Sequence, residues 1–303
     1  MTHPKITPTV ELALLCLLAL LWGSSYLLIK VAVETIAPVT LIAARVTIAA
    51  VFLLAVIRRA GERLPRDRRT WRRLFVQAVF NSIGAWTVLA WGQQYVDSGL
   101  ASVLNSTSPI FVLLFTLLVT RHEATDGMKL LGAGLGVLGV TLTVGIDALD
   151  GLARQVAAQL AVLLGAVLYA CAAIYGRSLS HLSPMVAAAG TMLWASACLV
   201  PLSLALDQPW TLRPSAASLA AALVLAVLCT GVALLVYFRL IRTLGSMGVA
   251  SQSYLRAGVG VLFGVLVLGE RITPLVGLGL AVSILGVIAI NLPAALRRTV
   301  RSG

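Results

Sequence analysis

Ten apolar runs, each 19 to 23 residues long, constrain this chain more than any other feature of its sequence. The hydrocarbon core of a bilayer is about 30 Å thick, so a helix needs about 20 apolar residues to cross it. Strands of a membrane barrel are shorter and alternate in hydrophobicity. We therefore expect an all-α membrane protein with ten transmembrane helices, at residues 12–32, 39–57, 74–95, 99–120, 128–146, 156–176, 184–206, 216–238, 248–269 and 274–292.

Composition excludes a soluble protein, because 59% of the residues are hydrophobic and only 11% are charged. A soluble domain has about 25% charged residues. The first run follows Lys5, lacks a small-residue cleavage site and precedes nine more runs, so we interpret it as a retained helix and not a signal peptide. The four cysteines lie in four different runs without metal-type spacing. No phosphate-binding glycine loop is present, and we expect no metal and no cofactor.

The Lys and Arg residues predict how the chain is oriented. If the N-terminus is cytoplasmic, seventeen of the 23 fall in cytoplasmic segments and three in outer ones, namely Arg154, Arg213 and Arg271. The opposite orientation would invert this bias and break the positive-inside rule. We therefore expect a multi-pass protein of the cytoplasmic (inner) membrane with both termini inside. The basic stretch 58–73 is a short loop between two runs, so it needs no nucleic-acid partner to explain it.

The second half of the chain repeats the first at an offset of 147 to 149 residues. Trp22 matches Tyr169, Gly99 matches Gly248 and Glu123 matches Glu270. We expect two units, 1–147 and 148–303. Each unit has five runs, an odd number, so the second unit begins on the opposite side of the membrane and is inverted. Inverted repeats are typical of secondary transporters.

Short connections and small residues add local expectations. Asp97 or Ser98 can cap the fourth helix, and Ser183 precedes Pro184 at a helix start. Glycines gather in the fifth and tenth runs. Since small residues let helices approach closely in lipid, we interpret these runs as helices that pack inside one molecule.

Several short motifs resemble one transporter family. They are Trp22-Gly23-Ser24-Ser25 followed by Lys30 and Arg45, Ser108-Pro109 in the fourth run, and Leu268-Gly269-Glu270. With both halves in register, the chain resembles drug/metabolite transporter (DMT) superfamily members of the EamA type over almost its whole length. The resemblance implies ten helices, a central cavity and export of small metabolites, often amino acids. Thr120-Arg121-His122-Glu123 departs from the Leu-Gly-Glu pattern, and Ala257 stands where proline is frequent, beside Gly258 and Gly260.

Charges inside a membrane are costly and usually functional. Lys30, Arg45 and Arg256 lie within the runs, and no Asp or Glu does. Lys30 is close to a helix end, where it can reach the interface. Arg45 is either a structural clamp or a substrate contact. For Arg256, deep in the ninth run, we hypothesise attraction of a substrate carboxylate. The missing acids, together with three histidines in predicted cytoplasmic segments, predict weak or no obligatory proton coupling.

Polar and aromatic side chains recur on predicted helix faces. Gln77, Asn81, Trp91 and Tyr95 share one side of the third helix, and Ser102, Asn105 and Pro109 one side of the fourth. Such groups suit a zwitterion whose backbone is held by polar atoms and whose side chain is held by rings. Trp and Tyr near helix ends can instead be interface anchors. The predicted substrate cavity comprises Trp22, Tyr26, Gln77, Asn81, Trp91, Tyr95, Ser102, Asn105, Tyr169, Tyr237, Tyr254 and Arg256, with hinges at Pro109, Gly258 and Gly260.

These features predict a secondary transporter that exports small metabolites, with amino acids favoured, by alternating access. Its partners are the substrate and membrane lipid, without nucleic acid; we expect a monomer, with a dimer as the alternative. Export of lipophilic or cationic drugs fits less well, because no run carries an acid to balance a cation. A channel would need a filter-like segment, and a membrane enzyme would need a nucleophile, a metal or an acid–base set. The sequence shows none of these.

Overall fold

The fold is that of a computed structural model. The structure describes residues 8–115, 127–128, 131–132, 134–139, 142, 153–237, 239–240, 252–271 and 273–291. All regular structure in these ranges is helical. The helices of the first half are α1 (Pro8–Ala32), α2 (Pro38–Arg59), α3 (Arg68–Ala78), the π-helix η1 (Val79–Ala85), α4 (Trp86–Gly92), α5 (Ser98–Asn105) and α6 (Ser108–Phe115).

The second half follows the same scheme. It contains α8 (Ala153–Gly176), the 3₁₀-helix η3 (Arg177–Leu179), α9 (Pro184–Leu206), the 3₁₀-helix η4 (Pro209–Thr211), α10 (Ala216–Ala226), the π-helix η5 (Val227–Val232), α12 (Gln252–Leu268) and α13 (Pro274–Asn291). In both halves the third long helix contains a π-helical segment, because α3, η1 and α4 are continuous and η5 continues α10.

Six helical stretches are long and apolar enough to cross a membrane by themselves: Thr9–Ala32, Pro38–Arg59, Arg68–Gly92, Gln155–Gly176, Pro184–Leu206 and Ala216–Tyr237. Shorter apolar helices lie at Leu255–Leu268 and Gly277–Gly286. The third span starts six residues before the expected 74–95, because four arginines open the helix. The predicted fourth, fifth and ninth runs lie partly outside the described residues. The expectation of an all-helical, multi-pass membrane protein is confirmed.

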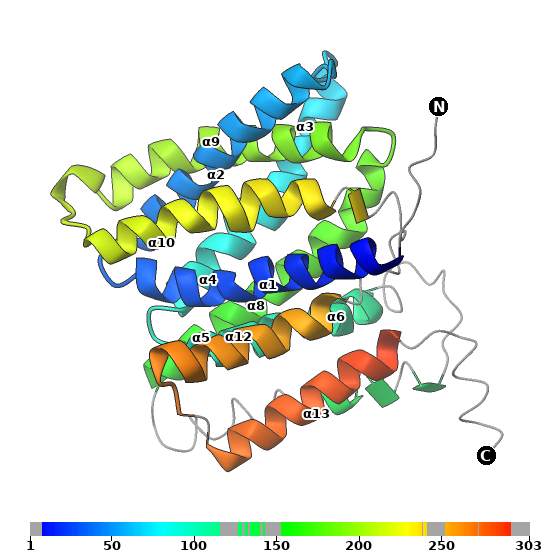
Figure 1. Cartoon of the computed structure of the whole chain (residues 1–303), viewed down its shortest axis with the longest axis vertical. Coiled ribbons are helices and arrows are strands. Elements are labelled where there is room, and N and C mark those ends of the chain that lie inside the picture. Colours follow the sequence, from blue (N-terminus) through cyan, green and yellow to red (C-terminus); the bar gives the residue numbers. More distant parts are fainter. Residues whose placement is uncertain are drawn as a thin grey trace.

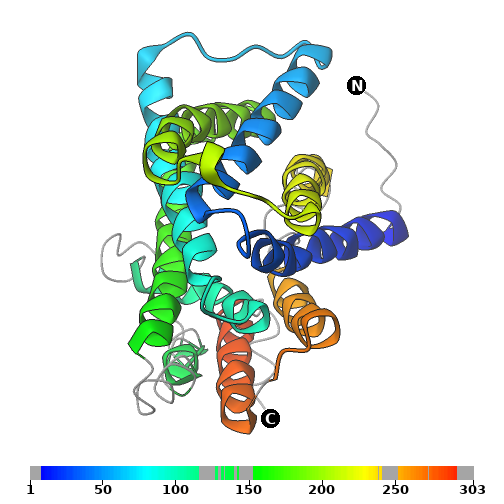
Figure 2. The same cartoon turned by 90° about the vertical axis from the view of Figure 1, so that its left-hand side faces the viewer.

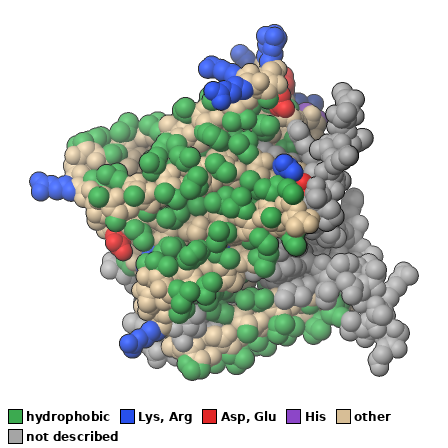
Figure 3. Space-filling model, in the orientation of Figure 1, with side chains coloured by type: hydrophobic (Ala, Val, Ile, Leu, Met, Phe, Trp, Pro, Cys, Tyr) green, Lys and Arg blue, Asp and Glu red, His purple; other side chains and the backbone are tan. Residues whose placement is uncertain are grey.

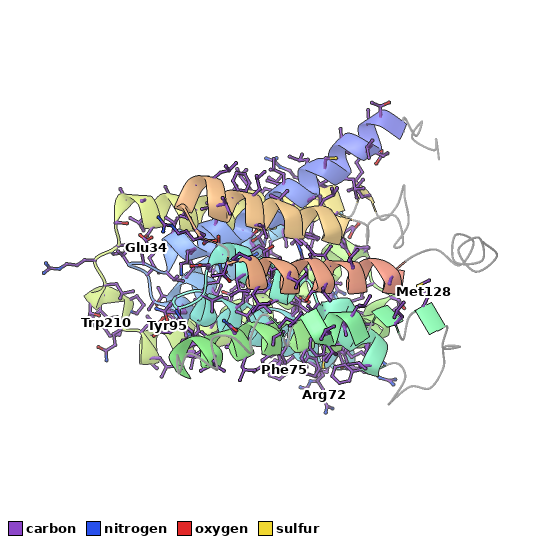
Figure 4. All side chains as sticks on the ribbon, turned by 90° about the horizontal axis from the view of Figure 1, so that it is seen from below. Glu34, Arg72, Phe75, Tyr95, Met128 and Trp210 are labelled. Atoms are coloured by element: carbon purple, nitrogen blue, oxygen red, sulfur yellow. The ribbon has the colours of Figure 1, made fainter. Side chains whose placement is uncertain are left out.

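The long helices lie side by side in one bundle (Figure 1). The helix α1 lies between α10 and α12, and α2 packs on α9. Figure 2 shows the same order from the end of the bundle. Glu34, Tyr95 and Trp210 lie at one end, and Arg72 and Met128 toward the other (Figure 4). We call these the Glu34 end and the Arg72 end. The start of α1 and the finish of α13 are both at the Arg72 end.

The sides of the bundle are apolar and its charges lie at the ends (Figure 3). Leucines on the outward faces of several helices are more than 40% exposed, among them Leu12, Leu160, Leu223, Leu262 and Leu278. In water such a surface would be unfavourable, whereas in lipid it costs nothing. The arginines of the 58–73 stretch lie at the Arg72 end, as a loop flanking two spans should.

Helix starts are fixed by side-chain oxygens that accept backbone N–H groups. Asp67 accepts from Thr70 at 2.7 Å, and Ser183 accepts from Val186 at 3.3 Å, as the Ser183-Pro184 pair predicts. The expected cap of α5 is different: Asp97 makes no capping hydrogen bond at this helix. The carboxylate of Glu270 from the second half takes that place.

Glycines allow the last helix to pack closely. A Cβ on Gly286 would lie 2.5 Å from the backbone oxygen of Gly132, and one on Gly139 would lie 2.5 Å from that of Gly279. The described glycines of the fifth and tenth runs therefore pack against one another within the molecule, as expected.

Candidate substrate site

Tyr26 of α1 lies at the centre of the polar contacts between helices. Its side chain is 3% exposed, and its hydroxyl accepts a hydrogen bond from Asn105 Nδ2 of α5 at 2.7 Å. Its backbone oxygen accepts from Gln93 Nε2 at 2.8 Å. The hydroxyl is therefore held in one place, and the Asn105 amide is turned toward it.

The helix α12 approaches α1 and α5 through glycines. A Cβ on Gly23 would lie 2.6 Å from Val259, and one on Gly260 would overlap Ser102 of α5 and come within 3.5 Å of the Tyr26 ring. Gly258, by contrast, has open space where its Cβ would be. The close approach at Gly260 brings this part of α12, with Arg256 one turn earlier, against Ser102 and Tyr26.

Several buried polar atoms near this contact have no hydrogen-bond partner among the described residues. They include Arg256 Nε, a donor, and the acceptors Asn105 Oδ1 and Gln93 Oε1. A buried polar atom without a partner is costly, so such atoms point to a bound water, ion or ligand. A ligand with one acceptor group and one donor group could satisfy Arg256 Nε and Asn105 Oδ1.

Arg45 of α2 is buried and well held. Its Nε donates to Thr230 Oγ1 at 2.9 Å, and its guanidinium carbon lies 3.9 Å from the centre of the Trp86 ring. The Thr230 hydroxyl in turn donates to the Leu225 backbone oxygen at 2.9 Å, across the wide turn of η5. A guanidinium over an aromatic face is stabilised by the ring quadrupole. Within the described residues Arg45 makes no ion pair with Glu34, the partner that a clamp at this level could have used.

Tyr169 of α8 connects these groups. Its side chain interacts electrostatically with Tyr26, Arg45 and Arg256 and hydrogen-bonds with the Trp86 indole. Helices from both halves thus converge on one site. We call it the central polar cluster, and it comprises Tyr26, Arg45, Trp86, Asn105, Tyr169, Thr230 and Arg256. None of the seven is acidic, and two are cationic.

The structure places the other predicted cavity residues elsewhere. Trp22 and Tyr237 stack on each other at 5.4 Å in a separate apolar group with α1 leucines. Trp91 is 39% exposed and packs on Tyr95 at the Glu34 end, with ring centroids 5.5 Å apart. Ser102 lies beside the cluster and faces Gly260.

Gln77 and Asn81 lie on the third span, before and within η1. Gln77 is near Gly176 at the end of α8, and Asn81 Nδ2 donates to Ser82 at 3.1 Å. Among the described residues, neither makes a hydrogen bond, ion pair or ring contact with the central polar cluster. The side chains of Tyr254 and Pro109 lie outside the described residues. The fourth span breaks at Ser106 and Thr107, just before Pro109.

Trp86 and Thr230 are cluster members that the sequence alone did not indicate. Both are uncharged, and each lies in a span rich in other candidates. The one available signal is their link to the intramembrane Arg45, which only the fold reveals. Among the described residues no group of three His, Cys, Asp or Glu side chains could hold a metal ion.

A helical bundle with an apolar outer surface and a polar, cationic centre defines a multi-pass membrane protein. The profile of the EamA-like transporter family matches the chain twice, over residues 9–145 and 156–292, and the chain belongs to this family. The resemblance seen in the motifs is thereby confirmed.

Two transporters and one solved structure are similar to this chain over most of its length. The uncharacterized inner membrane transporter YedA of Escherichia coli K12 is 27% identical over 91% of this chain and 88% of its own. A probable terminal-alkyne amino-acid exporter of Streptantibioticus cattleyicolor is 26% identical over 91% and 92%. One solved crystal structure matches with a TM-score of 0.67 at 16% identity, covering 96% of this chain and 99% of that one, which shows a shared fold.

Proposed function

We propose that this transporter exports amino acids or similar small metabolites by alternating access between two inverted five-helix halves, residues 1–147 and 148–303. The repeated sequence, the double family match and the π-helices at corresponding places support this division. The amino-acid exporter among the relatives supports the substrate class.

One observation carries the substrate proposal. Arg256 Nε and Asn105 Oδ1 are a buried donor and a buried acceptor without partners among the described residues, on helices that pack together. A carboxylate would accept from Arg256, and an ammonium group would donate to Asn105. Tyr26 and Tyr169 would contact the rest of the substrate. Ser102, beside the cluster, would line the path, whereas Trp22, Gln77, Asn81, Trp91, Tyr95, Tyr237 and Tyr254 stay predictions from the sequence.

The alternative substrates are lipophilic or cationic drugs. The two arginines of the central polar cluster would repel a cation, and no acidic side chain in the cluster would balance it. An anionic or zwitterionic solute therefore fits better. The ten predicted runs carry no acidic residue, and Glu11, in the first turn of α1, is bound in an ion pair with Arg239 at 3.0 Å. We therefore also propose exchange or facilitated diffusion without obligatory proton coupling.

The membrane orientation follows from the charge bias. The Arg72 end would face the cytoplasm, with both chain termini inside, and the Glu34 end would face outward. In this arrangement all ten predicted helices cross the membrane as a monomer, with dimerisation as the alternative. The break before Pro109 and the glycines Gly258 and Gly260 would supply flexibility during the cycle.

Counterflow into proteoliposomes tests the proposal. Unlabelled amino acids are loaded inside, and entry of a labelled one is followed without a pH gradient. We expect saturable counterflow for a few amino acids. Arg256→Gln should raise KM about tenfold or more, because a hydrogen bond to a charged group contributes about 1.5–3 kcal/mol. Arg256→Lys should lose less, and Arg271→Gln, which removes an exposed arginine next to the same helix, should change nothing.

Amino-acid amides, which lack the carboxylate, make this test specific. The wild type should prefer the acid to its amide, and Arg256→Gln should lose that preference. If Arg256→Gln keeps both its KM and its preference, the residue does not bind a carboxylate. Accumulation that strictly requires a pH gradient would contradict transport without proton coupling.

A further inference from the structure

The two halves are joined by a polar ladder along α2 and α9, the most extensively packed pair of described helices. At the Glu34 end, Asp207 Oδ2 accepts from the Thr40 backbone N–H at 2.7 Å, and the Thr40 and Ser203 hydroxyls are 2.8 Å apart. In the middle, the Thr47 and Ser196 hydroxyls are 2.7 Å apart. Polar contacts of this kind hold transmembrane helices together.

A hydrogen bond also joins the two helices at the Arg72 end. The Ser183 hydroxyl, at the start of α9, donates to the Glu62 carboxylate beyond the end of α2. This contact mirrors the Asp207 contact, since in each case an acid that follows one helix binds the first turn of the other. Both ends are bound in the same structure. In this structure the α2–α9 pair is therefore open at neither membrane face.

A different contact joins the halves at the Glu34 end. Glu270, between α12 and α13, accepts the Ser98 N–H with Oε1 at 2.6 Å and the Gly99 N–H with Oε2 at 2.9 Å. A carboxylate at a helix N-terminus satisfies free N–H groups and complements the helix dipole. Its place depends on glycines: Gly269 has φ +67°, and a Cβ on Gly264 would overlap Glu270 Oε2.

The Glu270 contact lies between the central polar cluster and the Glu34 end. Ser102 is one turn further along α5 from Gly99, and Asn105 is one turn beyond Ser102. The helix α12, which ends just before Glu270, carries Arg256 and Gly260 to the same place. Any path from the cluster to the Glu34 end between α5 and α12 is therefore closed by this carboxylate.

We propose that Glu270 is the latch of the gate at the Glu34 end: its bond to the start of α5 holds the gate shut and breaks when α12 separates from α5. The α2–α9 pair stays bound throughout and acts as the axis. The proposal rests on alternating access, but it does not depend on the identity of the substrate. Glu270 is a positioning residue, since it acts on the substrate path through α5.

Accessibility of a cysteine below the latch tests the proposal. In a chain with Cys16, Cys171, Cys198 and Cys229 replaced by alanine, Ser102→Cys serves as reporter, because Ser102 is fully buried. A membrane-impermeant maleimide is added to right-side-out or to inside-out vesicles. Glu270→Gln should raise the labelling rate from one side only, by about tenfold, the population change that corresponds to loss of one hydrogen bond to a charged group.

A second variant removes the other partner. Ser98→Pro deletes the N–H that Glu270 Oε1 accepts. Proline fits the first position of a helix, and Asp97 before it is already extended at ψ 148°. It should reproduce the one-sided rise even if Glu270→Gln folds poorly. Glu34→Gln, an exposed acid at the same end, is the control and should leave the rate unchanged.

Two results would overturn the latch. One is an unchanged rate in both folded variants, and the other is an equal rise from both sides, which indicates general loosening. Because labelling needs no substrate, absence of amino-acid counterflow in the wild type would refute the proposed substrate and leave this test valid.

Discussion

Arg45 and Arg256 differ in how completely their surroundings satisfy them. Arg45 has a hydrogen bond to Thr230 and a ring beneath its guanidinium, whereas Arg256 Nε has no partner among the described residues. These contacts support a structural clamp for Arg45, one of the two roles that the sequence left open. Arg256 is therefore the arginine whose Nε can still donate a hydrogen bond to a substrate.

Thr230 should therefore act through Arg45. We expect Thr230→Val to leave Arg45 Nε unpaired and to cost about 1 kcal/mol of stability, the scale of hydrogen bonds between transmembrane helices. Thr230→Ser, which keeps the hydroxyl, should restore the wild-type value. Thermal unfolding of the purified protein in detergent measures both. A loss of stability in the serine variant but not in the valine variant would mean that the methyl group, not the hydroxyl, is what matters.

From the sequence, a residue of the central polar cluster could be predicted only if its side chain is energetically costly to place in lipid. Arg45 and Arg256 are charges inside spans, and Tyr26 and Asn105 are polar groups that should avoid lipid. Trp86 carries no such signal, because an apolar ring suits the lipid face as well as a cluster. Its role depends on Arg45, which is 41 residues earlier in the chain and reaches it only in the folded protein.

At the scale of elements, the third span shows where the assumption of 3.6 residues per turn fails. Gln77, Asn81, Trp91 and Tyr95 share a face only if every turn holds 3.6 residues. The π-helix η1 has wider turns, with i→i+5 bonds, and therefore rotates everything after it. Trp91 consequently faces outward, and Tyr95 lies beyond the end of α4 at Gly92. Nothing in the residues 79–85 marks a π-helix in advance.

The cap of α3 can be tested by changing the pH, because Asp67 lies outside the membrane spans. Hydrogen bonds from the Thr70 hydroxyl and backbone N–H lower the pKa of Asp67 below its usual value of 3.8. A lowered folded-state pKa means that the cap stabilises the protein above about pH 4 and stops doing so as the pH falls through that lower pKa.

Asp67→Ala should thus unfold at a slightly lower temperature than the wild type at pH 7. The difference should shrink as the pH is lowered below 3.8, where the unfolded-state carboxyl also becomes protonated. Melting curves of the two proteins across this range provide the measurement. A difference that stays constant down to pH 2 would show that the carboxylate charge plays no part in the cap.

For the whole molecule, the polar ladder and the Glu270 contact predict opposite effects of cross-linking. Cysteines at Thr47 and Ser196, whose hydroxyls are 2.7 Å apart, should form a disulfide within the axis and leave counterflow largely intact. Cysteines at Ser98 and Gly264 should lock the gate, since a Cβ on Gly264 would lie 3.0 Å from Ser98 Oγ. The disulfide would take the place of the Glu270 carboxylate, which the new Cβ displaces.

Both pairs are placed in the cysteine-free chain and oxidised, and counterflow is measured before and after reduction. The Ser98–Gly264 pair should block transport until dithiothreitol is added. Inhibition by the Thr47–Ser196 disulfide would instead place movement between α2 and α9 and refute the axis.

The membrane fold could be predicted from the sequence because length and hydrophobicity of a span follow directly from the thickness of the bilayer. Residues at 12–32, 39–57 and 184–206 form α1, α2 and α9 within a few positions of their expected bounds. Glu270 shows the limit of that logic. The repeat and the Leu268-Gly269-Glu270 motif marked it as a recurring acid but gave it no role, and its importance comes from a helix start 171 residues away.

The two π-helices begin 148 residues apart, at Val79 and Val227, at the same place in each family match. Two independent insertions at one equivalent position would be a coincidence, whereas doubling of a shorter gene would copy a single insertion into both halves. On the proposed division into two inverted units, we therefore expect the wide turn to predate the full-length chain: an ancestor half this size would already have had it, and would have had to pair with a second, oppositely inserted copy of itself.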